Sequence, residues 1–592
     1  MLKTFSRYIG EFKWDTLLTP VFTALEVVME ILIPFVTASI IDKGVRAGDI
    51  SAVFRYGGIM LVLAFLGLLF GILAGYYAAS ASSGFARNLR EGMYENIQTF
   101  SFSNIDKFST AGLVTRMTTD VQNLQMAFQM IIRVAIRAPL MLVCSVAMCV
   151  MIHPRISLIF LVALSVLGVA LFSIIGKVSP IFDNVFHRYD DLNASVQENV
   201  TGIRVVKAFV REEQENEKFR AAAENLRALF FKAESILALN QPVMMLVVFG
   251  SIIGLSWFGA HFIVEGSLTT GNLTSLFSYI MSMMMSLMML SMIFVMMTMS
   301  VASARRIAEV LEEKADLSDP ADPVKEVPDG SIDFDHVSFS YHRGQGSGED
   351  TLRDIHLHIG AGETIGIIGG TGCGKSTFVS LISRLYDVTE GTVKVGGRDV
   401  REYDMEVLRD QVAVVLQKNV LFSGTVLENL RWGKEDAALE ECREVCRQAC
   451  ADEFIQKLPQ GYDTWIEQGG TNVSGGQRQR LCIARALRKR PKVLILDDST
   501  SAVDTATDAR IRKAFAERIP GVTKLIISQR VSSIRDADRI LVLEEGRVEG
   551  FGTHDQLMAQ GGVYKEIYDA QTQGGGDFDA PESDEDNGKE AK

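Results

Sequence analysis

A glycine-rich run in the second half of the chain has the spacing of a phosphate-binding loop. Residues 369–376 read GGTGCGKS, which matches GxxxxGK[ST], between a β-like apolar run over 364–368 and a helical pattern over 376–386. In such a loop, backbone N–H groups surround phosphate oxygens, Lys375 reaches the β- and γ-phosphates, and Ser376 offers a hydroxyl to Mg²⁺. The N-terminus of the following helix adds a favourable dipole. The candidate nucleotide-binding residues of this loop are Gly369, Gly370, Thr371, Gly372, Cys373, Gly374, Lys375, Ser376 and Thr377.

A second candidate site is a pair of aspartates at the end of an apolar run. Residues 492–496 read KVLIL and predict a buried strand that ends in Asp497 and Asp498. A carboxylate at the end of such a strand, beside a phosphate-binding loop, can hold Mg²⁺. We therefore expect Asp497 to bind Mg²⁺ together with Ser376. The alternative is that one of the two aspartates only caps a helix.

A third motif lies between the first two and precedes an arginine-rich helical run, RQRLCIARAL. The hydroxyl of Ser474 and the backbone N–H groups that follow it can donate to a phosphate at a helix N-terminus. The order of the three motifs resembles that of ATP-binding cassette (ABC) transporters, in which this signature faces the phosphate loop of a second cassette. The signature residues are Val473, Ser474, Gly475, Gly476 and Gln477.

The resemblance implies roles for residues outside these motifs. Tyr341 stands where the family stacks adenine, Gln417 is the Q-loop residue expected to contact Mg²⁺, and residues 501–504 with Asp504 match the D-loop. ATP would be held between two cassettes. A chain with one cassette must therefore pair with a second half-transporter.

Two residues depart from the family pattern at the positions nearest the attacking water. The family places a glutamate after the Mg²⁺-binding aspartate as general base, and this chain has Asp498 there. One methylene fewer withdraws the carboxylate by about 1.5 Å, and a misplacement near 1 Å can cost on the order of 10²-fold in rate. Gln529 replaces the usual switch histidine and cannot take up a proton. We predict a site that binds ATP and Mg²⁺ but hydrolyses slowly or not at all; alternatively, both substitutions are tolerated.

The rest of the cassette keeps most of the family pattern. Val473 replaces a leucine, and residues 466–470 read IEQGG where homodimeric exporters have VGExG. This asymmetry resembles the degenerate-site subunit of a heterodimeric bacterial multidrug exporter. We predict that residues 474–477 and Asp504 complete the active site of a second, non-identical half-transporter, whereas this chain's own loop forms the degenerate site.

The composition excludes several classes of protein. The chain has 592 residues, of which 48% are hydrophobic, and a mean hydropathy of +0.17, which argues against a purely soluble or a disordered protein. A net charge of -13 argues against a nucleic-acid partner.

Stretches of about 20 apolar residues can span a bilayer. The candidates are residues 16–41, 57–80, 133–152, 156–178, 236–264 and 272–299.

Loop lengths and charge predict the topology. Short connections join spans 1–2, 3–4 and 5–6, whereas long connections of helical pattern separate the others, and residues 179–234 are rich in Lys and Arg. Because positive charge stays cytoplasmic, we expect the long connections, both termini and the α/β domain in the cytoplasm, and the chain in the plasma membrane. Phe5, Tyr8, Ile9 and Phe12 predict an N-terminal helix on the membrane surface.

Two features of the spans could contact a transported compound. Ten methionines lie between Met281 and Met299; they suit varied apolar ligands or simply face lipid. Glu26 and Glu30 lie one turn apart, as do Arg133 and Arg137. Charged groups at membrane depth face a cavity or a partner, so the glutamates could attract a cationic substrate or pair with the arginines.

The predicted fold class is multi-domain, with a six-helix α transmembrane domain followed by an α/β P-loop nucleotide-binding domain. The family implies coupling helices within residues 101–121 and 199–212. Expected boundaries are 1–315 for the transmembrane domain, 316–330 for a linker, 331–570 for the cassette and 571–592 for a disordered acidic tail. The expected function is ATP-driven export of drugs or other lipophilic compounds by a heterodimer, with ATP and Mg²⁺. Alternatives are lipid or peptide export or siderophore import on the same fold, and a membrane-attached ATP sensor.

Overall fold

The structure is a computed structural model that describes residues 2–341, 350–498 and 505–573. Internal contacts divide the chain into two compact units, Met1–Gln98 with Thr110–Glu313 and Thr99–Ser109 with Lys314–Lys592. Each unit has a buried apolar core of its own. The expected D-loop with Asp504 and most of the expected acidic tail lie outside the described residues.

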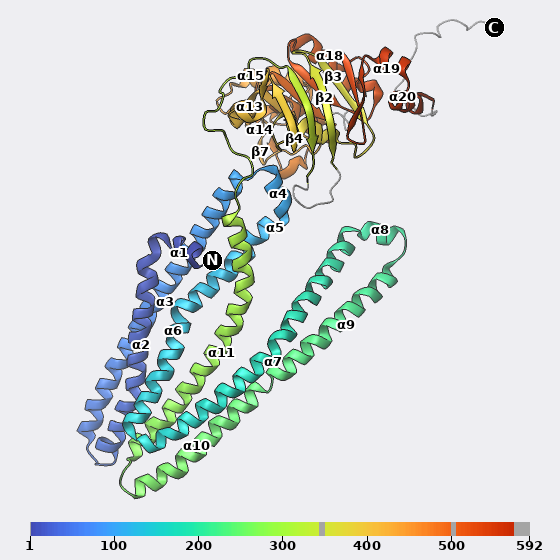
Figure 1. The fold of residues 1–592 in the computed structure, drawn as a ribbon. Coiled ribbons are helices and arrows are strands. Elements are labelled where there is room, and N and C mark those ends of the chain that lie inside the picture. The colour runs from blue at the N-terminus through green and yellow to red at the C-terminus, as the bar shows by residue number, and fades with distance from the viewer. Residues whose placement is uncertain (1, 342–349, 499–504, 574–592) are drawn as a thin grey trace, which may run out of the picture. The chain divides into compact units, whose positions relative to one another are not determined.

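The first unit consists of long helices (Figure 1). It contains six stretches that are long and apolar enough to cross a membrane, which confirms the predicted number of spans: Gly10–Val45, Ile50–Thr99, Thr110–Ile152, Pro154–Phe182, Glu212–Val264 and Thr270–Leu290. The helices are α1 (Leu2–Arg7), α2 (Lys13–Ile40), α3 (Ile50–Thr99), α5 (Thr110–Thr115), α6 (Val121–Ile152), α7 (Pro154–Thr201), α8 (Ile203–Ala208), α9 (Glu212–Leu237), α10 (Asn240–Val264) and α11 (Thr270–Glu312).

Two of these helices are much longer than a bilayer is thick. α3 has 50 residues and α7 has 48, so at 1.5 Å per residue each is more than about 70 Å long, against about 30 Å of hydrocarbon. The charged helix α9 runs beside α7, is joined to it through α8, and leads into the apolar α10 (Figure 1). The second long connection is therefore a pair of helical extensions, as its pattern predicts.

The tight turn between α6 and α7 has a local cause. His153 has an extended backbone, and its Nδ1 accepts a hydrogen bond from the Ile156 N–H at 3.3 Å. Pro154 opens α7, where a missing N–H leaves no intrahelical bond unmade. His153 is thus the one residue between the two helices, and α6 and α7 pack against each other.

The N-terminal helix is shorter than the sequence pattern predicts, and its aromatic side chains contact α3. α1 ends at Arg7. The ring of Phe5 meets that of Phe85 edge-on with centroids 6.5 Å apart. A Cβ at Gly84 would lie 2.2 Å from the ring of Phe12, so only glycine leaves room for this ring on α3. Aromatic side chains expected at the membrane surface therefore pack on α3.

The second unit is an α/β domain with two main sheets. Six strands have the order β12-β11-β3-β10-β9-β6, and four have the order β2-β1-β4-β5. Neighbours in the larger sheet pair in parallel except β11 and β12. All residues of β9 and β10 are buried, as in sheets covered on both faces. The strands are β1 (Ile332–Phe339), β2 (Leu352–Ile359), β3 (Thr364–Gly369), β4 (Glu390–Val395), β5 (Arg398–Asp399), β6 (Val412–Val415), β7 (Gly424–Thr425), β8 (Trp465–Ile466), β9 (Val493–Asp497), β10 (Thr523–Ile527), β11 (Arg539–Glu544) and β12 (Arg547–Gly552).

The helices of this unit connect and cover the strands. The helix after the phosphate loop ends at Ile382, earlier than its pattern predicts, and Arg384 just beyond it has a left-handed backbone with φ of +50°. The helices are α4 (Phe102–Phe108), α12 (Lys375–Ile382), α13 (Met405–Gln411), α14 (Val426–Arg431), α15 (Leu439–Gln448), α16 (Asp452–Ile455), α17 (Gly475–Leu487), α18 (Thr505–Arg518), α19 (His554–Gln560) and α20 (Val563–Gln573).

The short helix α4 belongs to the second unit although it lies between membrane spans in the sequence. The side-chain amide of Asn104 donates to the Lys314 carbonyl oxygen at 3.0 Å, and the Tyr386 hydroxyl donates to Asp106 at 2.7 Å. Of the first expected coupling region, residues 101–121, only 101–109 group with the second unit, whereas residues from 110 onward group with the first. The second expected region contains α8, within the first unit.

Candidate nucleotide-binding site

Parallel strands carry the candidate site residues to one edge of the larger sheet. β3 leads into the glycine loop, β9 ends at Asp497, and β6 and β10 end just before Gln417 and Gln529. Because β3, β6, β9 and β10 are parallel, their carboxyl ends lie at the same edge, where ligands of open α/β sheets bind. The sheet order, with β10 between β3 and β9, thus brings these residues together.

The glycines of the loop have two distinct structural roles. A Cβ at Gly369 would lie 2.0 Å from the Leu543 carbonyl oxygen, and one at Gly374, where φ is +97°, would lie 2.8 Å from Leu352. These two positions therefore require glycine for backbone conformation and close packing. At Gly370 and Gly372 no atom lies within 4 Å of such a Cβ. This open side leaves room for phosphate oxygens.

Lys375 is folded back over the loop. Its ammonium donates to the carbonyl oxygens of Gly369 at 2.9 Å and Gly370 at 2.7 Å. Thr371 belongs to the same turn, and the side chain of Cys373 is buried beneath it. A phosphate oxygen would offer this ammonium a charge-assisted hydrogen bond in place of a neutral carbonyl. When a nucleotide binds, the Lys375 ammonium can therefore exchange these carbonyl oxygens for phosphate oxygens and keep its hydrogen bonds.

Ser376 and Asp497 form an oxygen pair that fits Mg²⁺. The Ser376 hydroxyl donates to Asp497 Oδ1 at 3.1 Å. Burial raises the pKa of Asp497, an effect that the Ser376 hydrogen bond opposes. A cation beside this carboxylate would favour its charged form. Mg²⁺ prefers oxygen ligands, and bound here it would neutralise charge on the nucleotide phosphates.

Asp498 lies next to both other residues expected around the attacking water. Its carboxylate accepts a hydrogen bond from Gln417, and Gln529 Nε2 lies 3.5 Å from Asp498 Oδ2. Burial raises the pKa of Asp498, and the bond from Gln417 opposes this rise. The backbone N–H of Asp498 donates to the Ile527 carbonyl oxygen at 3.2 Å. A short acidic side chain is thus held on a backbone anchored between two central strands.

Tyr341 presents an exposed ring beside the phosphate loop. Its hydroxyl shares a hydrogen bond with Thr377 Oγ1 at 2.9 Å, and 48% of the residue is exposed. Phe339 and Tyr386 meet the ring edge-on, with centroids 4.9 Å and 5.3 Å away. A ring supported at its edges can stack a base on its open face. Sequence reasoning missed both supporting rings; only the alternation of Phe339 and Tyr341 hinted at one of them.

The signature motif opens helix α17. Ser474 is the N-cap: its hydroxyl accepts from the Gln477 N–H at 3.3 Å, and the Gln477 side chain accepts from the Ser474 N–H at 2.9 Å. The side chain of Gln477 is therefore part of the N-terminal cap of α17. Ser474 and Gly475 are exposed, and Gly476 is half-buried. The first N–H groups of this helix are directed to a surface on which an anion can bind.

Three of the four charged residues singled out in the spans pair with one another within the first unit. Arg137 donates to Glu26 and, at 2.7 Å, to Glu30 Oε2. Of the two alternatives for the glutamates, the structure therefore shows the ion pair with arginine. The methionines of α11 point in several directions, since Met283 and Met284 are buried while Met285 is exposed.

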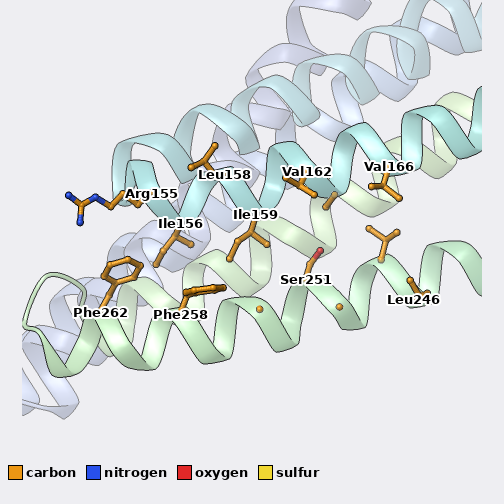
Figure 2. A pocket seen from close by; sticks show the side chains of 14 residues that line it. Arg155, Ile156, Leu158, Ile159, Val162, Val166, Leu246, Ser251, Phe258 and Phe262 are labelled. Carbon is orange, nitrogen blue, oxygen red and sulfur yellow. The ribbon is translucent and has the colours of Figure 1, made fainter.

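Two pockets lie among the membrane helices. One of about 620 Å³ is formed by α7 and α10, where apolar side chains such as Ile159 and Phe258 line it, Ser251 is a polar member and Arg155 lies at one end (Figure 2). Another, of about 420 Å³, is formed mainly by α6 and contains Arg133 and Arg137. The unit thus offers both an apolar and a cationic surface.

Both units match known protein families. The family described as ABC transporter transmembrane region matches residues 16–288, and the family described as ABC transporter matches residues 352–501. The chain is 36% identical over 546 residues to the uncharacterized ABC transporter ATP-binding protein YfiB of Bacillus subtilis, covering 92% of this chain and 94% of that protein. It is also 36% identical over 543 residues to the uncharacterized protein Rv1273c of Mycobacterium tuberculosis, covering 91% and 93%.

The fold also has a solved counterpart. A bacterial Atm1-family ABC exporter with ATP bound superposes with a TM-score of 0.80 at 24% identity, over 94% of this chain and 99% of that one. Matches of this extent cover both the six spans and the nucleotide domain. The chain therefore belongs to the ABC transporter family, as a multi-pass membrane protein with a cytoplasmic ATP-binding domain and the fold of an Atm1-type exporter.

Proposed function

We propose that this chain is one half of a heterodimeric, ATP-driven exporter, and that its own nucleotide site binds ATP and Mg²⁺ but hydrolyses ATP slowly or not at all. The observation that carries the proposal is the pair Asp498 and Gln529, which lie 3.5 Å apart at the carboxyl ends of β9 and β10. The candidate binding groups Lys375, Ser376 and Asp497 lie at the same edge of the sheet, which supports retained nucleotide binding.

The geometry of Asp498 supports slow hydrolysis. Its backbone is tied to Ile527, so the carboxylate cannot advance by moving the chain. Relative to glutamate it falls short by about one C–C bond, 1.5 Å. A cost on the order of 10²-fold in rate corresponds to about 2.7 kcal/mol in the activation barrier. Gln529 can hold a phosphate oxygen by hydrogen bonding, but unlike histidine it cannot take up and release a proton.

The signature surface supports pairing with a different subunit. The N-terminus of α17 is exposed at Ser474 and Gly475 and intact as an anion-binding end. A chain that keeps this surface while losing its own base is suited to complete an active site in a partner that retains the base. We infer that residues 474–477 and Asp504 serve that partner, a second, non-identical half-transporter.

The proposed organisation has a transmembrane domain at residues 1–315, a linker at 316–330, the cassette at 331–570 and a tail at 571–592. Both termini would be cytoplasmic, and the membrane would be the plasma membrane. Tyr341 would stack the adenine, Gln417 would sense Mg²⁺ and the γ-phosphate, and the loop from Gly369 to Thr377 would hold the phosphates. Their positions at one sheet edge support these roles.

Export of lipophilic or amphipathic compounds is the transport activity that the membrane unit favours. Its helices carry an apolar pocket of about 620 Å³ and exposed methionines, surfaces that accept varied apolar ligands. Six spans with long helical extensions exceed what an ATP sensor anchored to a membrane needs.

The test is ATPase activity of this chain alone and co-purified with candidate partner half-transporters. We expect little activity alone and strong activity with the right partner, abolished when the partner's own base glutamate is replaced by glutamine. As a matched control, Asp498→Asn in this chain should change the activity of the pair little. Strong activity of the chain alone, lost in Asp498→Asn, would refute the degenerate-site proposal.

A further inference from the structure

The smaller membrane pocket is unusual in its charge. It measures about 420 Å³ and is lined by one face of α6 with Met289 of α11. Two of its side chains are the arginines Arg133 and Arg137, one is Gln129, and the others are apolar; none is acidic. The pocket therefore combines two cationic side chains with methionines and has no acidic side chain in its lining.

The two arginines differ in how their charge is compensated. Arg137 donates to Glu26 and Glu30, so its charge is shared by two carboxylates of α2. Arg133, one turn away and half-buried, forms no hydrogen bond or ion pair with any residue that the structure describes. The pocket therefore contains one guanidinium whose donors are available to a ligand.

Glycines of α3 make room for these charges. A Cβ at Gly75 would lie 3.3 Å from Arg133 Nη1, and one at Gly71, a turn away, would lie 3.1 Å from Glu26 Oε1. Larger residues at either position would push the charged groups aside. The Arg133 guanidinium thus lies beside Gly75 of α3, which has no side chain, and Arg133 also lines the pocket.

The depth of Arg133 suits a ligand arriving from the cytoplasmic side. It lies about 28 Å along the helix axis from the end of α6 at Ile152, at 1.5 Å per residue. The hydrocarbon core is about 30 Å thick, and the α6–α7 turn is at the outer face in the topology proposed above. Arg133 is therefore near the inner boundary of the membrane.

We propose that Arg133 binds the anionic group of the transported compound, so that the substrate class includes amphipathic organic anions, with one carboxylate, sulfonate or phosphate on an apolar body. The inference rests on the proposed export function. The apolar body would pack on Met126, Met130 and Met289. One negative charge balances Arg133 and leaves the Arg137 ion pairs intact, whereas a cation would have to displace Arg137 from the glutamates.

The same chemistry can come from a water-soluble amphiphile or from the headgroup of an anionic lipid in the inner leaflet. Binding is measured without nucleotide, on the purified pair of half-transporters in nanodiscs of phosphatidylcholine. The probes are 1-pyrenebutanoate and the cation 1-pyrenebutyltrimethylammonium, which share one apolar body, and fluorescence anisotropy reports binding. Adding phosphatidylglycerol to the nanodiscs distinguishes the sources, because a lipid ligand would compete with the anionic probe.

We expect the anion to bind more tightly than the cation. Arg133→Gln should weaken the anion about tenfold, equivalent to about 1.4 kcal/mol, and Arg133→Lys should keep most of the affinity. Arg220→Gln, on the charged helix α9 and outside both pockets, is the matched control and should change nothing. Competition by phosphatidylglycerol would support the lipid source, and its absence the soluble one.

Tighter binding of the cation, or equal loss of both probes in Arg133→Gln, would overturn the inference. So would a loss of thermal stability in Arg133→Gln that Arg133→Lys restores without any change in anion affinity, because Arg133 would then be structural. Since ATP is absent, failure here is separable from failure of the export proposal, which the partner-dependent ATPase assay tests.

Discussion

Replacing Asp498 by glutamate should restore hydrolysis at this chain's own site. The added methylene carries the carboxylate forward by about 1.5 Å, while the backbone stays tied to Ile527 at 3.2 Å. We expect the rate to rise by on the order of 10²-fold, a lowering of the barrier by about 2.7 kcal/mol. Adding Gln529→His should raise it further, because histidine can exchange a proton.

The assay isolates this site by pairing the variant with a partner whose own base glutamate is replaced by glutamine. Single-turnover release of γ-labelled phosphate then reports only the Asp498 site. Asp498→Asn is the control for side-chain volume and should stay at the low background rate. Nucleotide binding is measured in parallel, so that a change in occupancy is not read as a change in chemistry.

An Asp498→Glu variant that binds ATP and Mg²⁺ normally but hydrolyses ATP no faster than the natural chain would refute this explanation. The defect would then lie elsewhere in the composite site. If Gln529→His alone restored hydrolysis, the loss of the proton-exchanging side chain, and not the short reach of Asp498, would be the dominant cause.

Three further predictions follow from single contacts. Arg137→Met leaves Glu26 and Glu30 without their half-buried partner and should lower the stability in detergent by about 1–3 kcal/mol, whereas Glu26→Gln should cost clearly less; equal effects in thermal unfolding would contradict this. Tyr341→Ala should weaken ATP binding about tenfold through lost stacking, measured by competition with a fluorescent nucleotide, with Tyr341→Phe close to the natural chain. Burial raises the pKa of Asp497. Mg²⁺-dependent ATP binding should therefore be present above that pKa and fall as the pH drops through it, at a higher pH than for an exposed aspartate. An equal pH dependence in Asp497→Asn would disprove the role of Asp497 as a Mg²⁺ ligand.

Much of the candidate site could be predicted because its information is local. Eight consecutive residues specify the phosphate loop, and the short strand before Asp497 is apolar throughout. The number of spans was equally predictable, since a window of about 20 apolar residues is recognised from its own composition. Helix ends were less predictable: α12 stops at Ile382 although the apolar pattern continues.

Other features depended on contacts that no local pattern records. The spacing of the N-terminal aromatics predicts a membrane-surface helix, but it does not reveal that Phe12 packs at Gly84 of α3. The segment around α4 groups with the cassette through bonds such as that from Tyr386 to Asp106, which are 280 positions apart. The rings that support Tyr341 likewise come from separate elements.

The phosphate-loop pattern, the six spans and the presence of Asp498 and Gln529 where the family has glutamate and histidine can be recognised in the sequence, because each is a property of residues close together in the chain. Which charges meet in the membrane depends instead on how the helices pack. Two arginines and two glutamates were available, and the packing of α2, α3 and α6 gives both carboxylates to Arg137 and leaves Arg133 facing a pocket. Ion pairs between helices depend on rotation and depth, which are set by packing across more than 100 positions of sequence.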